Sequence, residues 1–326
     1  MTSGKIKLVL FFAGLLLLLA LARQIGFYEI AKTIAGAKLP LAFLGVFFYL
    51  LLIFVRSLKW FILAKIIRNE ISYRRLLPLY LVNSLIGNLT PLKSGETATP
   101  FLFKKYLSIP VGQGFSIIIL DRFFELLIFA VIFVSAIFYM LNQGIQNDLI
   151  SSVFRWALAA VFLLLFVLIA ALVSKRLTLK IVRFFKIFGF IEKELDNFYN
   201  ALSLFKNKKG RQLIVALLTA MGWFLTILSY YLVFVSVSPV SFIDITVAQV
   251  IATGTTFVTF VPGGIGVGEV GVVYVLGLLS YPVVLAASGA ILAKLFLAGA
   301  LLVTGFIGLA LLPRLRVDDI GKAPDA

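Results

Sequence analysis

The 326-residue chain contains no cysteine and no histidine. This excludes disulfides, thiolate nucleophiles, imidazole bases, haem ligation by histidine and the usual zinc sites. The sequence also shows no acidic metal cluster and no nucleotide-binding loop, although a glutamate could still act as a general acid or base. We therefore expect no cofactor and no catalysis by this chain.

Charged residues are scarce as well, at 13% of the chain, whereas hydrophobic residues make up 62%. With a mean hydropathy of +1.10, the chain has too little polar surface to cover a water-soluble globule. Its apolar runs of about 20 residues are typical of helical spans and not of the short alternating strands of an outer-membrane barrel. The composition predicts an all-α, multi-pass protein of the cell membrane.

Six apolar runs are long enough to cross a hydrocarbon core of about 30 Å. They lie near residues 6–22, 40–63, 113–141, 152–173, 212–237 and 282–312. The first run follows Lys5 and Lys7, as in a secretory signal, but no small-residue cleavage site precedes Arg23. We therefore expect this run to remain as the first membrane helix.

Two further apolar stretches, 76–103 and 244–281, are each interrupted by helix-breaking residues. The first break runs from Pro91 to Glu96, and the second from Pro262 to Glu269. Each half is shorter than the ~20 residues that a crossing needs. Broken backbone with a carboxylate at membrane depth is tolerated only where protein or a wet cavity shields it. The pattern predicts two re-entrant helix pairs that meet near the middle of the bilayer.

Positive charge gathers in one segment of the chain. Residues 174–211 carry ten Lys and Arg residues, whereas 142–150 and 238–243 carry none. Because loops rich in Lys and Arg stay in the cytoplasm, both termini are expected inside, with the first hairpin entering from the cytoplasmic face and the second from the outer face. The net charge of +16 is then explained by cytoplasmic loops that face anionic lipid. We therefore expect membrane lipids as partners and no nucleic acid.

Two similar hairpins that insert from opposite faces are the signature of an inverted-topology repeat. The sequence predicts one transmembrane domain, 1–316, with pseudo-repeats 1–150 and 151–316, each in the order span, span, re-entrant hairpin, span. Segment 174–211 has the composition of a basic amphipathic helix on the inner leaflet, and a linker that only fixes topology explains it equally well. Residues 317–326 form a short polar tail. The pattern is compatible with a monomer or an oligomer.

Each break is followed at nearly equal distance by a cation within the next apolar run. Glu96 and Arg122 are separated by 26 residues, and Glu269 and Lys294 by 25. A carboxylate without a partner at this depth would protonate, so we predict the ion pairs Glu96–Arg122 and Glu269–Lys294. Each pair either pins its hairpin permanently or exchanges when an incoming phosphate competes for the cation.

The predicted site extends to the residues around both breaks. Glycines in the second break allow close approach of the backbone, and the helix that resumes after Gly268 presents N–H groups that can hold an anion. The predicted substrate-binding residues are Lys93, Glu96, Arg122, Gly263, Gly264, Gly266, Glu269 and Lys294, and the predicted structural or coupling residues are Pro91, Gly95, Asp121, Glu125 and Pro262.

Other charges lie within the neighbouring spans. Arg122 and Glu125 are three residues apart on one helix and are expected to touch, whereas Asp121 is expected to point elsewhere. Arg56 and Lys59 are expected to extend to the inner membrane interface rather than to face the cavity.

Three motifs in this order resemble the lysylphosphatidylglycerol synthase transmembrane, or flippase-like, family, and the similarity covers nearly the whole chain. The motifs are Gly87-Asn88-Leu89-Thr90-Pro91 with Gly95-Glu96, then Leu120-Asp121-Arg122-Phe123, then Pro262-Gly263-Gly264-Ile265-Gly266-Val267 with Glu269. The resemblance implies a polytopic protein that moves or handles anionic lipids or lipid-linked precursors across the membrane.

The chain departs from the family pattern in three respects. Thr99 and Lys294 stand where family members commonly have Arg. Lys294 can still bind phosphate as a point charge, but the planar bidentate capture that an Arg provides is lost. The soluble aminoacyltransferase domain of the two-part enzymes is also absent from the sequence, so the resemblance implies the membrane function and no synthase activity.

The sequence therefore favours translocation of an anionic phospholipid or lipid-linked precursor, with its headgroup in a cavity that opens sideways to the bilayer. One alternative is a proton-coupled secondary transporter of a small anion, which needs the same charges in a site closed to lipid. Another is a non-catalytic accessory protein of a membrane glycosyltransferase system, in which the charges serve structure alone.

The absence of native cysteine makes the predicted topology directly testable. A cysteine introduced at Asn147 should react with a membrane-impermeant maleimide added outside intact cells, and a cysteine at Lys208 should react only after the membrane is opened. The reverse labelling pattern would contradict the inverted arrangement of the two hairpins.

Overall fold

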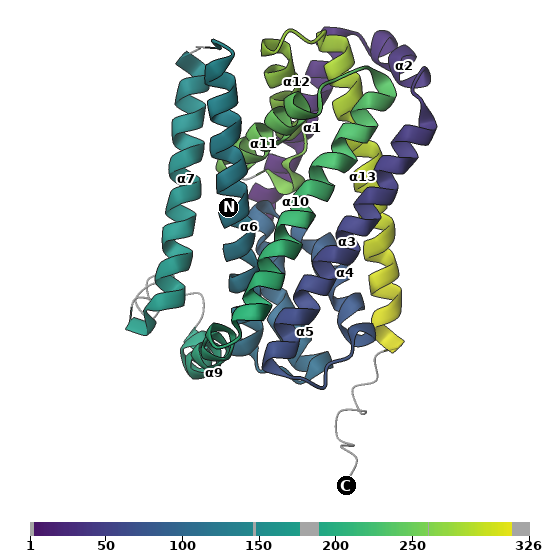
Figure 1. Cartoon of the computed structure of the whole chain (residues 1–326). Helices are drawn as coiled ribbons and strands as arrows, with labels where there is room; N and C mark the ends of the chain where they lie inside the picture. The colour runs from purple at the N-terminus through teal and green to yellow at the C-terminus, as the bar shows by residue number, and fades with distance from the viewer. Residues whose placement is uncertain (1–2, 146–147, 177–188, 260, 315–326) are drawn as a thin grey trace.

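The computed structural model describes residues 3–145, 148–176, 189–259 and 261–314 (Figure 1). This part of the chain is all-helical, as predicted. Its α-helices are α1 (Ser3–Ile25), α2 (Phe27–Ala35), α3 (Leu39–Ile67), α4 (Tyr73–Asn88), α5 (Thr99–Leu107), α6 (Val111–Asn142), α7 (Asp148–Val173), α9 (Gly189–Lys206), α10 (Lys209–Val237), α11 (Phe242–Thr259), α12 (Val267–Leu278) and α13 (Val283–Leu311), and its 3₁₀ turns are η1 (Pro91–Ala98), η2 (Pro262–Gly264) and η3 (Leu312–Arg314).

Four helices, α3, α6, α10 and α13, are long and apolar enough to cross a membrane. They confirm four of the predicted spans. The predicted span 6–22 lies in α1, which qualifies only together with α2 across an 87° bend next to Gly26. The predicted span 152–173 lies in α7, whose described apolar stretch, Leu158–Ala170, is shorter than a crossing needs.

The two stretches predicted to be broken are both helix–break–helix units. In the first, α4 and α5 flank η1; in the second, α11 and α12 flank η2 and pack against each other. The first unit occupies the lower part of the bundle and the second the upper part, so they enter from opposite ends (Figure 1). α4 packs on α13, and α11 packs on α6.

Glycine produces the second break. Gly263, Gly264 and Gly266 have φ values of 62°, 61° and 81°, a region that strains any residue with a Cβ atom. A Cβ on Gly266 would also collide with the carbonyl oxygen of Gly14, so α1 lies directly against this break. The break therefore needs glycine for both its conformation and its packing.

The first break is built differently. Pro91 begins η1, and the N–H of Gly95 donates a hydrogen bond of 2.8 Å to Oγ1 of Thr90. A Cβ on Gly95 would lie 2.9 Å from the carbonyl oxygen of Ile86, so glycine lets η1 fold back onto α4. The predicted structural role of Gly95 is thus the close approach of two backbone segments.

The tips of the two hairpins lie against each other. A Cβ on Gly263, in η2, would lie 3.0 Å from the carbonyl oxygen of Asn88, at the end of α4. Glycine also permits close helix contacts around this junction, with Gly45 of α3 against Val233 of α10 and Gly254 of α11 against the ring of Phe133. The structure therefore brings the two breaks into contact with each other.

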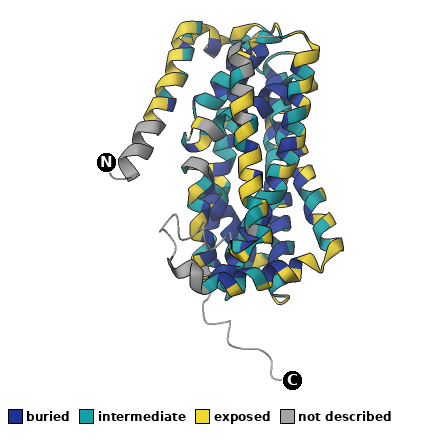
Figure 2. Cartoon of the chain, turned by 90° about the vertical axis from the view of Figure 1, so that its left-hand side faces the viewer, coloured by how far each residue is buried: buried dark blue, intermediate teal, exposed yellow. Residues whose placement is uncertain are grey.

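Exposed residues lie along the outer faces of the helices (Figure 2), and many of them are large and apolar. Phe43, Phe306 and Leu295 are 61%, 62% and 63% exposed. Surfaces of this kind are unfavourable in water and match the hydrocarbon of a bilayer. The apolar exterior, together with four helices long enough to cross a bilayer, identifies a membrane protein.

The basic segment 174–211 is only partly described. Its phenylalanine-rich piece, on which the amphipathic prediction rests, falls mostly within 177–188, outside the described residues. The described helix α9 lies at the lower end of the bundle and packs against α6 and α3 (Figure 1). Leu195, Phe198 and Leu202 are buried, and the N–H of Gly112 donates to the Glu194 carboxylate at 3.2 Å. α9 is therefore docked on the protein.

Two alanine substitutions two residues apart test the second break. Gly266→Ala should lower the free energy of unfolding by about 2 kcal/mol or more, because the left-handed backbone is strained by a Cβ and Gly14 leaves no room for it. At Gly268 a Cβ would make an ordinary 3.8 Å contact, so Gly268→Ala should change stability by less than about 0.5 kcal/mol. Thermal unfolding in detergent measures both; equal melting temperatures would contradict this account of the break.

Candidate functional site: a charged cavity at the first break

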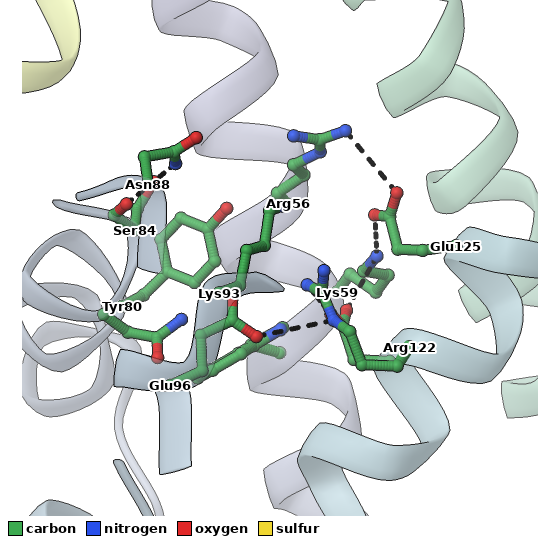
Figure 3. A pocket seen from close by; sticks show the side chains of 12 residues that line it. Arg56, Lys59, Tyr80, Ser84, Asn88, Lys93, Glu96, Arg122 and Glu125 are labelled. Carbon is green, nitrogen blue, oxygen red and sulfur yellow. Dashed lines mark hydrogen bonds and ion pairs between the residues drawn. The ribbon is translucent and has the colours of Figure 1, made fainter. Parts of the chain in front are cut away.

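A polar cavity lies inside the bundle between α3, α4, η1 and α6 (Figure 3). Its volume is about 20 Å³, which is room for about one water molecule. A phosphate-sized group therefore requires the surrounding elements to move apart. The cavity is lined by Arg56, Lys59, Trp60, Tyr80, Asn83, Ser84, Asn88, Lys93, Glu96, Asp121, Arg122 and Glu125.

The first predicted ion pair, Glu96–Arg122, is present in this cavity. Glu96 extends from η1 toward Arg122 of α6, with 3.5 Å between Arg122 Nε and Glu96 Oε2 (Figure 3). Arg122 Nη2 also lies 2.6 Å from Oδ2 of Asp121, its neighbour on α6. Arg122 Nε is buried and forms no hydrogen bond with a described residue. The guanidinium is therefore held tightly by Asp121 and loosely by Glu96.

Lys59 reaches from α3 and is almost fully buried, with a side chain that is 1% exposed. Its Nζ lies 2.7 Å from Oδ1 of Asp121 and 2.5 Å from Oε1 of Glu125. A charge away from water is tolerated when groups of opposite sign compensate it. Lys59 therefore links α3 to α6 through two carboxylates.

This network corrects the sequence-based placement of five side chains. Arg56 and Lys59 line the cavity, so the prediction that they extend to the inner membrane interface is wrong. Arg122 contacts Asp121, which was expected to point elsewhere. Glu125 contacts the two cations of α3 instead of Arg122. Helical spacing shows which side chains of one helix can touch, but not which face of α3 meets α6.

Two cations at the cavity are weakly engaged. Arg56 Nη2 lies 3.5 Å from Glu125 Oε2, and Arg56 Nε is buried without a hydrogen-bond partner among the described residues. Lys93 takes part in none of the ion pairs that the described residues form. Its φ of 55° is unusual for a residue with a side chain, and such strain is concentrated at functional sites. Both side chains are available to an anion.

The charges of the cavity do not balance. Its lining contains four cations and three carboxylates, a formal excess of +1. Because charge repulsion and burial in an apolar bundle both disfavour an excess of one sign, an anion that enters the cavity would compensate it. The chemistry of the site therefore suits an oxyanion such as a phosphate group.

The second predicted ion pair, Glu269–Lys294, is present as well, at the break of the second hairpin. Lys294 Nζ lies 3.0 Å from Glu269 Oε1 and donates a hydrogen bond of 2.9 Å to the carbonyl oxygen of Gly263. The N–H of Gly266 donates to Glu269 Oε2 at 2.6 Å, so the carboxylate caps the start of α12. Pro262 is buried beside them.

The two ion pairs lie at matched depths from opposite ends of the bundle. Arg122 is 11 residues from the start of α6, and Lys294 is 11 residues from the start of α13. At 1.5 Å per residue, each cation is about 17 Å along its helix. Both pairs are thus deep in the bundle and well away from its ends.

Sequence reasoning missed a polar bridge between the arms of the first hairpin. Thr99 Oγ1, at the start of α5, donates a 2.5 Å hydrogen bond to Asn83 Oδ1 of α4, and both residues are buried. Thr99 thus stabilises the hairpin at a position where the family resemblance leads one to expect a cation. Asn83 within an apolar helix was the available signal, because a buried amide at membrane depth needs a partner.

Removal of the Lys59 charge tests the buried network. Lys59→Met should destabilise the protein by about 3–5 kcal/mol, because Asp121 and Glu125 lose their shared partner while they remain buried. Neutralising Glu125 as well, in the double variant Lys59→Met, Glu125→Gln, should restore part of the loss, because Asp121 keeps Arg122 as a partner and the cavity returns to an excess of +1. Lys209→Met removes an exposed cation and serves as the control. Thermal unfolding measures all three, and a melting temperature of Lys59→Met equal to that of the control would contradict the network.

Comparison with known proteins agrees with this architecture. Residues 6–315 match the family described as the lysylphosphatidylglycerol synthase TM region. The chain is 25% identical over 333 residues to a UPF0104 membrane protein of Methanocaldococcus jannaschii, with 96% of each chain covered. It is also 25% identical over 275 residues to a UPF0104 membrane protein of Methanothermobacter thermautotrophicus, covering 79% of this chain and 81% of the relative. Because the match spans nearly the whole chain, the protein belongs to the lysylphosphatidylglycerol synthase transmembrane-region family.

Proposed function

We propose that this protein translocates the anionic headgroup of a phospholipid or lipid-linked precursor across the cell membrane. The headgroup passes through the interior of the bundle near the two hairpin tips, while the acyl or prenyl tails stay in the surrounding lipid. The observation that carries the proposal is the charged cavity with an excess of +1 inside a bundle whose exterior is apolar. The family description, which names a lipid, supports the same class of substrate.

The proposal also includes an inverted repeat as the basis of movement. α3 packs on α10, while α4 packs on α13 and α11 on α6, which is the pairing that exchange of the two halves would produce. Transporters with such repeats expose a central site to each side in turn by rocking one part against another. The small size of the cavity fits a closed state between these two arrangements.

The orientation in the membrane follows from charge. The lower end of the bundle in Figure 1 carries α9 and the ends of the first hairpin, with Arg74, Lys104 and Lys105. Loops rich in Lys and Arg stay in the cytoplasm, so we assign this end, at which α13 also ends, to the cytoplasmic side. α1 begins about halfway along the bundle in Figure 1, so the cytoplasmic N-terminus stays a prediction from the sequence. In this proposal the protein is a transporter and catalyses no chemical reaction.

A second candidate function is proton-coupled transport of a small water-soluble anion. The observation in its favour is the cavity volume of about 20 Å³, since a small anion requires less opening than a lipid headgroup does. The two functions share the same cations and differ in the route by which the substrate enters: from the lipid in one case and from water in the other.

Reconstitution in vesicles tests the proposed function. The wild-type protein should accelerate the flipping of a headgroup-labelled phosphatidylglycerol, and Arg122→Ala should reduce the rate to that of protein-free vesicles, because Arg122 supplies the central phosphate ligand. Arg155→Ala, on the exposed side of α7, is the matched control and should behave as wild type. Uptake of glycerol 3-phosphate without lipid flipping would instead support the small-anion transporter. Wild-type flipping by a folded Arg122→Ala variant would remove the site from the mechanism.

A further inference from the structure

The two glutamates that occupy similar places in the sequence are held in different ways. Glu96 and Glu269 are both buried, and each pairs with a cation on the next long helix. The contacts of their carboxylates differ in number, length and chemical type. That difference bears on which of the two ion pairs can open during function.

Both carboxylate oxygens of Glu269 are engaged, one within its own hairpin and the other by α13. Oε2 accepts a 2.6 Å hydrogen bond from the N–H of Gly266, and Oε1 lies 3.0 Å from Lys294 Nζ. Lys294 in turn donates to the Gly263 carbonyl oxygen at 2.9 Å. These three short contacts connect η2, the start of α12 and the middle of α13. An anion that displaced Glu269 would also have to uncap a helix and free a strained glycine turn.

Glu96 is engaged far less. Among the described residues its carboxylate forms one ion pair, 3.5 Å from Arg122 Nε, and that nitrogen makes no hydrogen bond. Arg122 also has a 2.6 Å contact with Asp121, through a different nitrogen atom from the one that faces Glu96. If Glu96 moved away, the Arg122 guanidinium would still contact Asp121, and its Nε would be free to bind another group.

The other weakly engaged cations lie around the same point. Arg56 has a buried Nε without a hydrogen bond among the described residues, and Lys93 lines the cavity on the strained turn of η1. Three cations thus face one displaceable carboxylate at the first break. At the second break Lys294 contacts a capping glutamate at 3.0 Å and a carbonyl oxygen at 2.9 Å.

We propose that the two halves of the protein have unequal roles: the first break forms the exchangeable anion site, in which Glu96 occupies the place that a phosphate-ester oxyanion takes on Arg122, Arg56 and Lys93, whereas the Glu269–Lys294 pair stays closed. This inference rests on the proposed function and assigns its substrate site to one half. Of the two alternatives that the sequence leaves open for each pair, it assigns exchange to Glu96–Arg122 and permanent pinning to Glu269–Lys294. The phosphate ester is either a lipid headgroup or a water-soluble molecule, since the same cations recognise both.

Displacement of Glu96 requires movement of η1. The cavity holds about one water molecule, and Glu96 packs against Gly87 of α4, where a Cβ would lie 2.9 Å from Glu96 Oε1. A shift of η1 relative to α4 would withdraw the carboxylate and enlarge the cavity in one step. The closed state is thus stabilised by a carboxylate of the protein that competes with the substrate.

Anion binding to the full-length protein in detergent tests this inference. Trp60 lines the cavity, packs on Tyr80 with ring centroids 5.3 Å apart, and provides a fluorescence signal. Trp60→Phe should remove that signal. The probes are glycerol 3-phosphate, as a water-soluble phosphate ester, and dihexanoylphosphatidylglycerol, as a lipid source.

Three glutamine variants compare the carboxylates. Glu96→Gln removes the internal competitor and should tighten binding by about tenfold, which corresponds to about 1.4 kcal/mol. Glu269→Gln should not tighten binding and should lower the melting temperature, because it weakens the cap of α12. Glu70→Gln, at a side chain that is 80% exposed, is the matched control and should change neither quantity. Glu96→Asp, which keeps the charge but shortens the side chain, should tighten binding less than Glu96→Gln and provides a second variant if the first does not fold.

Equal tightening by Glu96→Gln and Glu269→Gln would overturn the unequal roles, and so would a folded Glu96→Gln variant with unchanged affinity. Absence of any response to both probes would overturn the site itself. A response to either probe supports the site, and the probe that responds identifies the source of the phosphate. If Glu96→Gln tightens binding while vesicles show no lipid flipping, the translocation proposal fails and the anion site stands.

Discussion

The structure depends on one constraint: a charged side chain inside a bundle surrounded by hydrocarbon must find its partner within the protein. Lys59, at 1% exposure, meets this requirement with two carboxylates of α6, and Arg122 meets it with Asp121. The contacts of Lys59 set the position of α3 against α6. The free energy that holds the charges in place therefore also fixes the geometry of the cavity.

The same constraint explains why the chain is broken at two points. An unbroken helix would pair its backbone N–H and C=O groups with one another. No polar backbone group would then be free to interact near Glu96 or Glu269. The breaks expose N–H and C=O groups where neighbouring helices cover them, and glycine makes this possible at Gly263 and Gly266. The two similar motifs nevertheless have different chemistry. At the second break Glu269 caps a helix, whereas at the first break Arg56 and Arg122 each have an Nε without a hydrogen bond among the described residues.

Much of this could be predicted from local sequence. Apolar length gave α3, α6, α10 and α13, and the Pro and Gly residues located both breaks. The pairs Glu96–Arg122 and Glu269–Lys294 followed from the need for compensation at depth. The binding roles assigned to these residues stay predictions. The burial of Lys59 and its two carboxylate partners could not be predicted. They depend on how α3 is rotated against α6, and tertiary packing decides that rotation. The bend at Gly26 was missed because apolar length does not report an 87° change of direction.

The central claim is that two hairpins from opposite faces meet deep in the membrane. Spin labels on single cysteines, at Leu89 and Thr259 near the tips and at Lys104 and Ile243 near the outer ends, allow depth to be measured by power saturation with oxygen and a nickel chelate. The account predicts that Leu89 and Thr259 lie together near the midplane, with Lys104 and Ile243 at opposite interfaces. Tip labels at opposite interfaces, with depth changing steadily along each hairpin, would show straight crossings and contradict it.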